Sequence, residues 1–530
     1  MNQTLVVCLD GATFDLLEPW IQAGCLPQLK GLIEGGVRGN LESTCPPLTT
    51  PAWASFMTGK SPGGHGVYDF YRPDPRQESF VNSSDIKSRL FWEYLSDRGI
   101  TAGILNLPLT YPIRPMNGYL VSGLLSPGTE DSVYPRGLLD LFTPQLGPYR
   151  LTSELLYRPG DETGFAAEVM EITEAQIRYA LRMTRDIPTD LTIVHFLGPD
   201  ILQHKLWRFL DPKHPWFKPE ENPQIQATVR SLFERIDAGI SELRAVTPRD
   251  TNCLVISDHG FGPIDRLVNL NNHLINTGHL VLKKGLSTKI RFTAARIPAG
   301  SRVAWRLFRL LGRRYLVDFH DVDWARSKAY SRGHIGQIHL TIQGQPARDR
   351  LTDRDYRLLQ AEVTKVLSDI TDPRTGSSLT MRIIPNEIAN PGPFCRDGPD
   401  LIVLLDDFNA IAYPGFIADG KVITEQRHGD SGNHRPEGIL IANGPAFKRG
   451  ACLKGARMID LAPTLLHLAG VSVPDDMEGL VLADAYEPSF LDSHPVEFQA
   501  AGSLEAEDFD YPLVAHTALG DRLRSLGYLG

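Results

Sequence analysis

The sequence predicts an α/β protein with a doubly wound, mostly parallel sheet, helices on both of its faces, and an inserted cap region. Three observations predict this fold class. Short, apolar, β-branched segments recur along the chain, helical patterns lie between them, and Asp or His residues follow several of the apolar segments. Alternation of buried strands with helices is typical of parallel sheets that are covered on both faces.

The first expected strand is Thr4–Leu9, which ends on Asp10-Gly11. Similar segments follow at Ala102–Leu107, Leu191–Phe196, Cys253–Ser257, Leu401–Leu405 and Gly438–Ala442. The clearest helical patterns cover Phe165–Thr184 and Val229–Val246. Single cores stop growing at roughly 250–300 residues. A chain of 530 residues therefore has room for a large domain and a smaller one.

We expect a discontinuous α/β core over residues 1–265 and 396–490, an inserted cap or lid over 266–395, and a C-terminal tail over 491–530. Ten basic and no acidic residues lie between Lys283 and Arg314, and Val303–Val317 is amphipathic. Two interpretations of this basic run stay open. It is either the solvated face of cap helices, or a surface that binds an anionic substrate or an anionic membrane.

The bulk composition excludes several classes of protein. A net charge of -9 and a pI near 5.9 argue against general nucleic-acid binding. The sequence contains no run of about 18 apolar residues, so we expect no transmembrane helix. The six cysteines are scattered without a CxxC pair, and the first residues do not have the pattern of a signal peptide. We therefore expect reduced thiols and a cytoplasmic protein.

Polar residues with metal-binding chemistry fall at the ends of the expected strands. Asp10 follows the first strand, and Asp258-His259 follow Cys253–Ser257. Asp200 and His204 follow Leu191–Phe196, and their spacing of four places both on one face of a helix. Each residue alone is an ordinary cap or turn residue. Together they predict a site at one sheet edge, because ligands of open α/β sheets bind outside the carboxyl ends of the strands.

His434, in Gly-Asn-His-Arg-Pro-Glu-Gly just before the last strand, is a further candidate ligand. Aspartate combined with neutral histidine suits Zn²⁺ or Mn²⁺ better than Mg²⁺ or Ca²⁺. The candidate nucleophile lies in Leu48-Thr-Thr-Pro-Ala-Trp, where Pro51 suits the first turn of a helix running over Ala52–Thr58. Thr49 or Thr50 is expected to cap that helix. A hydroxyl at this position lies in a field that favours anions.

In these motifs the sequence resembles the alkaline phosphatase superfamily, and within it bacterial phosphohydrolases like the type I phosphodiesterases and nucleotide pyrophosphatases. The matching motifs occur in the family's order between about residues 5 and 480. They are Asp10-Gly11, Thr49-x-Pro51, Thr58-Gly59-x-x-Pro62-x-x-His65-Gly66, Asp200-x-x-x-His204, Ser257-Asp258-His259-Gly260, His434, and Ile459-Asp-Leu-Ala-Pro-Thr-Leu-Leu with Pro474-x-x-Met-x-Gly479.

The resemblance implies two divalent metal ions, most readily Zn²⁺, with Mn²⁺ as the alternative. Asp200, His204 and His434 would hold one ion. Asp10, Asp258, His259 and the Thr49 oxygen would hold the other. Thr49 rather than Thr50 would attack phosphorus and form a phospho-threonine, because the family's nucleophile stands two residues before the proline. The substrate would be a small or nucleotide-like phosphate ester, with a phosphodiester, phosphonate or pyrophosphate-type bond.

One position departs from the family's pattern. Nucleotide pyrophosphatases have an asparagine just after the nucleophile's proline, and Ala52-Trp53 stand here instead. Nucleotide specificity is therefore open. The alternatives are a sulfatase, which Cys45-Pro46-Pro47-Leu48 does not suit, a phosphomonoesterase or phosphomutase, and a metal-binding protein without catalysis.

Overall fold

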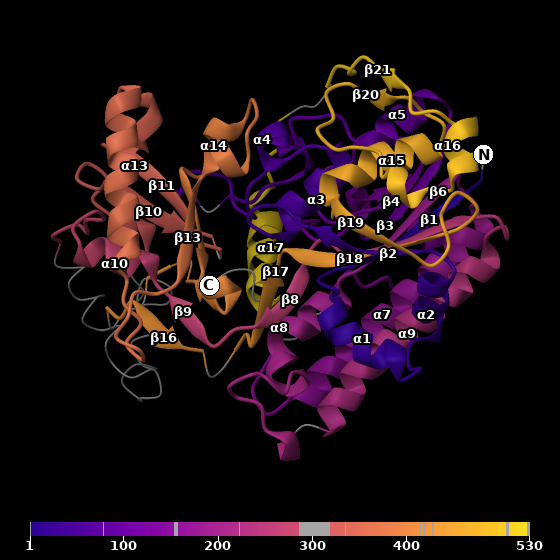
Figure 1. The fold of residues 1–530 in the computed structure, drawn as a ribbon, viewed down its shortest axis with the longest axis horizontal. Helices are drawn as coiled ribbons and strands as arrows, with labels where there is room; N and C mark the ends of the chain where they lie inside the picture. The colour runs from indigo at the N-terminus through magenta and orange to yellow at the C-terminus, as the bar shows by residue number, and fades with distance from the viewer. Residues whose placement is uncertain are drawn as a thin grey trace.

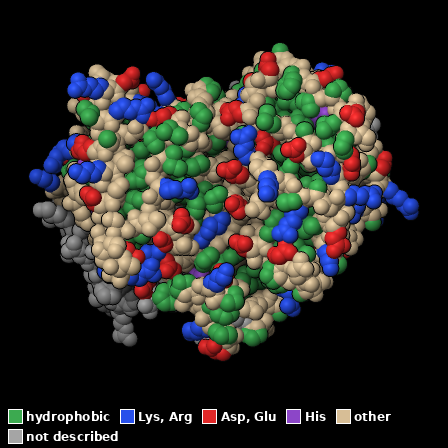
Figure 2. Space-filling model, viewed as in Figure 1, with side chains coloured by type: hydrophobic (Ala, Val, Ile, Leu, Met, Phe, Trp, Pro, Cys, Tyr) green, Lys and Arg blue, Asp and Glu red, His purple; other side chains and the backbone are tan. Residues whose placement is uncertain are grey.

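The computed structural model describes residues 2–77, 79–152, 157–221, 223–285, 318–333, 335–413, 415–416, 420–426, 429–504 and 508–526. These residues form two lobes, each with its own sheet and hydrophobic core (Figure 1). Figure 2 shows that the outline of the molecule is indented at the top, between the lobes, and that basic and acidic side chains are interspersed on this face.

A nine-stranded sheet forms the centre of the large lobe, with the order β19-β2-β18-β7-β1-β6-β3-β4-β5 across the described residues. Its strands are β1 (Thr4–Leu9), β2 (Val37–Glu42), β3 (Ala102–Leu105), β4 (Gly118–Val121), β5 (Val133–Tyr134), β6 (Leu191–Phe196), β7 (Asn252–Ile256), β18 (Glu437–Asn443) and β19 (Ala451–Arg457). Neighbours are parallel except where β18 or β5 takes part. The expected mostly parallel sheet is confirmed.

Helices cover both faces of this sheet (Figure 1). One face carries α1 (Phe14–Gln22), α2 (Pro27–Glu34), α7 (Glu162–Asp186) and α9 (Pro223–Val246), and the other carries α3 (Thr49–Thr58), α5 (Phe91–Asp97) and α15 (Leu461–Leu468). In α7 the apolar residues Phe165, Val169 and Ile172 recur at helical spacing and are buried. Both helices expected from sequence patterns are present, each extending beyond its predicted bounds.

The register of the parallel strands brings their carboxyl ends level. Cys8 of β1 pairs with His195 of β6 on one side and with Ile256 of β7 on the other. All six residues of β1 are buried, as expected of a strand with both faces covered. The segments that leave β1, β6 and β7 therefore start beside one another.

The smaller lobe has an antiparallel sheet in the order β10-β11-β14-β13. Its strands are β10 (Ala329–Arg332), β11 (Gln337–Ile342), β12 (Gln345–Pro346), β13 (Met381–Pro385) and β14 (Leu401–Leu405), and its main helices are α10 (Leu270–Asn276) and α13 (Asp353–Ser368). Ile338 and Leu401 belong to the core that α13 covers. Ile402 and Leu404 belong to a separate cluster with Leu48 of the large lobe.

Shorter elements complete the described chain. They are α4 (Pro62–His65), α6 (Thr143–Leu146), α8 (Gly198–Leu210), α14 (Asn386–Ala389), α16 (Pro488–Ser493), α17 (Leu513–Leu526), β8 (Gly260–Pro263), β9 (Arg266–Val268), β15 (Ala410–Ala412), β16 (Ile423–Glu425), β17 (Gly432–Arg435), β20 (Val473–Pro474) and β21 (Phe498–Gln499). No helix among the described residues is long and apolar enough to cross a membrane.

One strand lies in a different sheet from the one expected. Leu401–Leu405 is a strand, but it pairs with β11 and β13 and not with the strands of the large sheet. A short buried apolar run looks the same in either sheet, so only its pairing partners reveal where it belongs. Because β15 and β16 also pair with β9, we propose that the smaller lobe extends from residue 266 to about 425, and not only to 395.

The C-terminal segment is packed against the large lobe. Leu519, Leu523 and Leu526 of α17 are buried in the main hydrophobic core. Of the basic run, only Lys283 and Lys284 are among the described residues. The rest of that run, up to Arg314, and the amphipathic segment Val303–Val317 lie outside them.

Candidate active site

Thr49 is the first residue of α3. The preceding Leu48 is extended, with φ -131° and ψ 143°, and no side chain caps the helix. The expectation that Thr49 or Thr50 caps the helix is therefore wrong, because the helix begins one residue too early for either hydroxyl to reach a free N–H group. The buried Thr49 Oγ1 lies instead 3.3 Å from His259 Nε2. Its hydroxyl thus faces the cluster of expected ligands.

Asp10, Asp258 and His259 come together at the carboxyl ends of β1 and β7. The ligand atoms of these three buried residues lie within 4.8 Å of one another. His259 Nε2 is 3.6 Å from Asp10 Oδ1 and 3.3 Å from Asp258 Oδ2. The Gly11 N–H donates to Asp258 Oδ1, at 3.2 Å. Asp10 Oδ1 and Asp258 Oδ2 have no hydrogen-bond partner in the described part of the chain.

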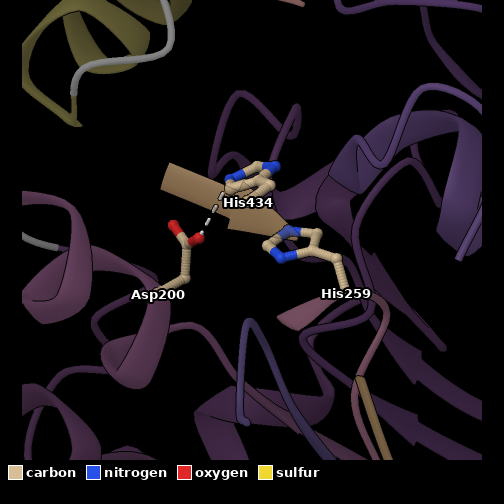
Figure 3. Close-up of side chains that lie close together, drawn as sticks. All are labelled: Asp200, His259 and His434. Atoms are coloured by element: carbon tan, nitrogen blue, oxygen red, sulfur yellow. Dashed lines mark ion pairs between the residues drawn. The ribbon is translucent and has the colours of Figure 1, made fainter. Parts of the chain in front are cut away.

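A second group consists of Asp200, His259 and His434, whose ligand atoms also lie within 4.8 Å of one another (Figure 3). Asp200 comes from the first turn of α8 and His434 from β17. Asp200 Oδ1 is 3.4 Å from His434 Nε2 and 3.4 Å from His204 Nε2. All seven residues expected from the sequence are therefore in one place, and His259 belongs to both groups.

The protonation of the three imidazoles follows from their backbone contacts. Nδ1 lies 3.2 Å from the Gly432 carbonyl oxygen in His204, 3.1 Å from that of Gly260 in His259, and 3.0 Å from that of Pro47 in His434. A carbonyl only accepts, so each Nδ1 carries the proton and donates it. Each Nε2 is then left with a lone pair that points into the site.

This arrangement fits bound cations. His204 Nε2 and His434 Nε2 are 3.0 Å apart, so two lone pairs face each other. Burial lowers the pKa of His204 to about 3, and that of His259 well below its usual value, so both of these rings are uncharged near neutral pH. Burial, together with Asp10 and Asp200, raises the pKa of Asp258. Divalent ions between these atoms would remove both kinds of repulsion.

Two residues next to the site were not expected to take part in it. His195 Nε2 lies 2.9 Å from Asp10 Oδ2, and Trp53 Nε1–H donates to the same oxygen at 3.3 Å. Both donors hold Oδ2, which turns Oδ1 toward His259. From the sequence, His195 is only a buried strand histidine. A histidine inside an otherwise apolar strand is the one signal that could have found it.

His65, which belongs to the family's motif, orders the turn after α3. Its Nδ1 accepts the Val67 N–H at 3.1 Å, so its Nε2–H donates to Ser55 Oγ at 3.1 Å. Burial lowers its pKa to about 3. The imidazole therefore acts as a neutral structural link between α3 and the loop that follows.

The nine-stranded sheet and its helices have the fold of the alkaline phosphatase superfamily. The family model for type I phosphodiesterase / nucleotide pyrophosphatase matches residues 4–431, and the chain belongs to this family. The chain is thus a phosphate-ester hydrolase of a class that uses two metal ions. His434 lies just beyond the matched residues.

Solved structures of ectonucleotide pyrophosphatase / phosphodiesterase 5 share the fold. Human ENPP5 matches with a TM-score of 0.52 at 15% identity, covering 92% of this chain and 100% of that one. Murine ENPP5 gives 0.51 at 13% identity, and its inactive variant in complex with AMP gives 0.52 at 14%, both with the same coverage. No sequence among curated proteins matches this chain.

Proposed function

We propose that the chain hydrolyses phosphodiesters, or related phosphonate or pyrophosphate-type bonds, through a covalent phospho-threonine at Thr49. One observation carries the proposal. The Thr49 hydroxyl is not used as a helix cap and lies 3.3 Å from His259 Nε2, at the ligand that the two candidate metal groups share. A buried threonine at a helix N-terminus, beside three aspartates, has no evident structural purpose there.

Two divalent ions would be held by residues of this chain. Asp200, His204 and His434 are proposed for one ion, and Asp10, Asp258, His259 and Thr49 for the other. When bound, such ions lower the pKa of a hydroxyl and neutralise charge on a phosphate. The mixed imidazole and carboxylate donors favour Zn²⁺, with Mn²⁺ as the alternative.

The chain's own residues supply the nucleophile and its orientation. The bond between Thr49 Oγ1 and phosphorus forms as the bond from phosphorus to the leaving oxygen breaks. Water then cleaves the phospho-threonine and restores the hydroxyl. The N-terminus of α3 presents backbone N–H groups and a partial positive charge to the phosphate. Asp10 is kept in place throughout by His195 and Trp53.

A nucleotide-like substrate is one candidate, since AMP is bound in a structure with the same fold. The asparagine typical of nucleotide pyrophosphatases is replaced here by Ala52-Trp53, and the Trp53 indole already donates to Asp10. Another group must therefore hold the phosphate oxygen. We accordingly propose a small phosphate ester, and leave nucleotide specificity open.

The competing activities have weaker support. A sulfatase needs a cysteine or serine in a C-x-P-x-R context, where it is converted to an aldehyde nucleophile, and Cys45-Pro46-Pro47-Leu48 does not provide this context. The remaining alternatives are a phosphomonoesterase or phosphomutase on the same fold, and a protein that binds metal without turnover. We also propose a cytoplasmic location, on the basis of the six free cysteines.

The test compares Thr49→Ala with Thr50→Val. Thr50 is also buried, and its Oγ1 has no partner within the described residues, so it is a matched control. Each variant is assayed with nitrophenyl phosphodiester, phosphomonoester and sulfate substrates, and its bound metal is measured. We expect Thr49→Ala to keep metal and lose turnover of the diester, while Thr50→Val keeps both.

Acid-quenched wild-type protein should contain phosphate on Thr49, detectable by mass spectrometry. Near-normal turnover by Thr49→Ala would exclude Thr49 as the nucleophile. Preferred cleavage of the sulfate ester would favour the sulfatase alternative. Metal binding with no turnover of any ester would favour the binding protein.

A further inference from the structure

A cavity of about 630 Å³ lies between the two lobes, away from the candidate active site. Residues 66–87 of the large lobe line one side, and residues of the smaller lobe, among them Trp324, Tyr330 and Arg332, line the other. None of the seven candidate metal and nucleophile residues lines it. Its volume is in the range that encloses a small organic ligand. We call it the inter-lobe cavity.

Two opposite charges are buried in the wall of this cavity. Arg332 and Asp69 each expose only 7% of their surface. Arg332 Nη1 and Asp69 Oδ2 both have no hydrogen-bond partner within the described residues. Burial raises the pKa of Asp69 to about 6 and lowers that of Arg332. The two charges attract each other through space, but no ion pair or hydrogen bond joins them within the described residues, so one polar atom of each is buried without a partner.

Both side chains are held in place by their other atoms. The Arg332 guanidinium lies over the Tyr71 ring, 4.6 Å from its centroid, and Nη2 donates to the Gln77 carbonyl at 3.3 Å. Asp69 Oδ1 accepts the Phe70 N–H at 2.6 Å. Arg332 Nη1 and Asp69 Oδ2 are thus a donor and an acceptor that are fixed in position and have no partner. Their fixed position reduces the entropy lost when a ligand binds.

A glycine allows the carboxylate to approach the smaller lobe. A Cβ atom at Gly333 would lie 2.2 Å from Asp69 Oδ2, and φ at this residue is +85°. Any side chain here would displace Asp69. The close approach of Asp69 to the residue after Arg332 thus depends on glycine, and both charges sit at the same end of the cavity.

The remaining wall is aromatic. Tyr330 of β10 stacks on His339 of β11, with ring centroids 4.9 Å apart and an interplanar angle of 11°. Trp324 meets the edge of Tyr330 at 5.2 Å. Aromatic faces attract organic cations and pack against flat or apolar groups. Of the other lining arginines, Arg72 pairs with Asp85, Arg76 with Asp74 and Arg348 with Asp400, and the fourth, Arg396, is exposed to solvent.

We propose that the inter-lobe cavity binds a small zwitterion, with its anionic oxygens on Arg332 and its ammonium group on Asp69 against the aromatic wall. A simple anion would leave Asp69 Oδ2 without a donor, and a simple cation would leave Arg332 Nη1 without an acceptor. A neutral sugar would supply hydrogen bonds but no opposite charge. Only a ligand with both charges meets both groups with charge-assisted hydrogen bonds.

The anionic end of such a ligand is either a carboxylate, as in free amino acids, or a phosphate, as in O-phosphoethanolamine. Calorimetric titration of the full-length, metal-loaded protein with the standard L-amino acids and with O-phosphoethanolamine distinguishes these sources. Acetate, ethylammonium and glucose serve as comparison ligands. We expect at least one zwitterion to bind at least about tenfold more tightly than every comparison ligand, because only it compensates both charges. Which one binds identifies the anionic end.

Variants of Arg332 and Asp69 test whether the zwitterion binds in the inter-lobe cavity. Arg332→Met and Asp69→Asn should each raise Kd by about 30-fold or more, as expected when one partner of a buried charge pair is removed. Arg76→Gln is the matched control, because Arg76 lines the same cavity but is already paired with Asp74. Its Kd should stay unchanged.

The double variant Arg332→Met/Asp69→Leu guards against misfolding of the single variants. Replacing both charges with apolar groups is often neutral or stabilising, so it should melt no lower than wild type and bind no zwitterion. Three results would overturn the proposal. They are no binding by any zwitterion, equal binding of a comparison ligand, or unchanged binding by the double variant.

Discussion

His195→Phe tests how the candidate metal site holds its first aspartate. Asp10 Oδ2 receives hydrogen bonds from His195 Nε2 at 2.9 Å and from Trp53 Nε1 at 3.3 Å, which leaves Oδ1 toward His259. Phenylalanine keeps a ring that can retain the edge contact with Trp53, where the centroids are now 5.0 Å apart. It removes only the donor to Asp10. The carboxylate is then free to rotate away from its metal-binding orientation.

The expected size follows from the geometry. A hydrogen bond to a charged group contributes about 1.5–3 kcal/mol, and loss of a partner behind a metal ligand lowers metal affinity or activity about 10–100-fold. We expect His195→Phe to lie in this range. Trp53→Phe should have the smaller effect, because its hydrogen bond is longer. His195→Gln should recover part of the loss, since its amide can also donate.

The assay is competition for Zn²⁺ with a chelator of known affinity, together with kcat/KM on a nitrophenyl phosphodiester. His467→Phe is the matched control, because His467 is also buried but its Nε2 bonds to the His494 carbonyl, on a different element. Unchanged Zn²⁺ affinity in His195→Phe would refute the positioning role. So would equal losses in the Gln and Phe variants, because a donor would then not matter.

Three further outcomes follow from the structure. Because the pKa of Asp258 is raised, its ionisation costs the metal-free protein stability as pH rises above about 4. Zn²⁺ binding requires the ionised carboxylate, so the Zn²⁺ affinity should rise with pH over the range in which Asp258 holds its proton, by up to about tenfold per unit, in chelator competition across a pH series from acid to neutral. A pH-independent affinity would contradict this. Gly11→Ala should lower the melting temperature and weaken metal binding, since φ is +67° and its Cβ would lie 2.8 Å from Phe261. Unaltered metal affinity would show that Gly11 does not position Asp258. Leu523→Ala on α17 should cost about 2–5 kcal/mol in denaturant unfolding, and a loss under 1 kcal/mol would mean that α17 is not part of the core.

The candidate site is buried although its side chains are polar. Asp10, Asp200 and Asp258 are all fully buried, and each has a ligand atom within 4.8 Å of one on His259. Ionised carboxylates buried so close together repel one another, and a bound cation would relieve that repulsion. The parallel strands and their helices supply the rigid frame that keeps these groups together.

The sequence by itself determined the strands of the parallel block and the residues at their ends. Apolar runs ending in Asp10 or in Asp258-His259 are local patterns, and parallel strands always deliver their carboxyl ends to one edge. That rule was enough to bring together five residues from three separate segments, namely Asp10, Asp200 with His204, and Asp258 with His259, whereas Thr49 and His434 follow no strand of that block. It needed no knowledge of which strand neighbours which.

Only the tertiary structure decided the features that depend on partners distant in the chain. It placed Leu401–Leu405 in the smaller sheet, moved the start of α3 so that Thr49 caps nothing, and set His195 and Trp53 against Asp10. It also formed the inter-lobe cavity from segments more than 200 residues apart. A local sequence pattern indicates which faces of a helix or strand are buried, but not which other elements cover them. The covering elements are determined by packing across the whole chain.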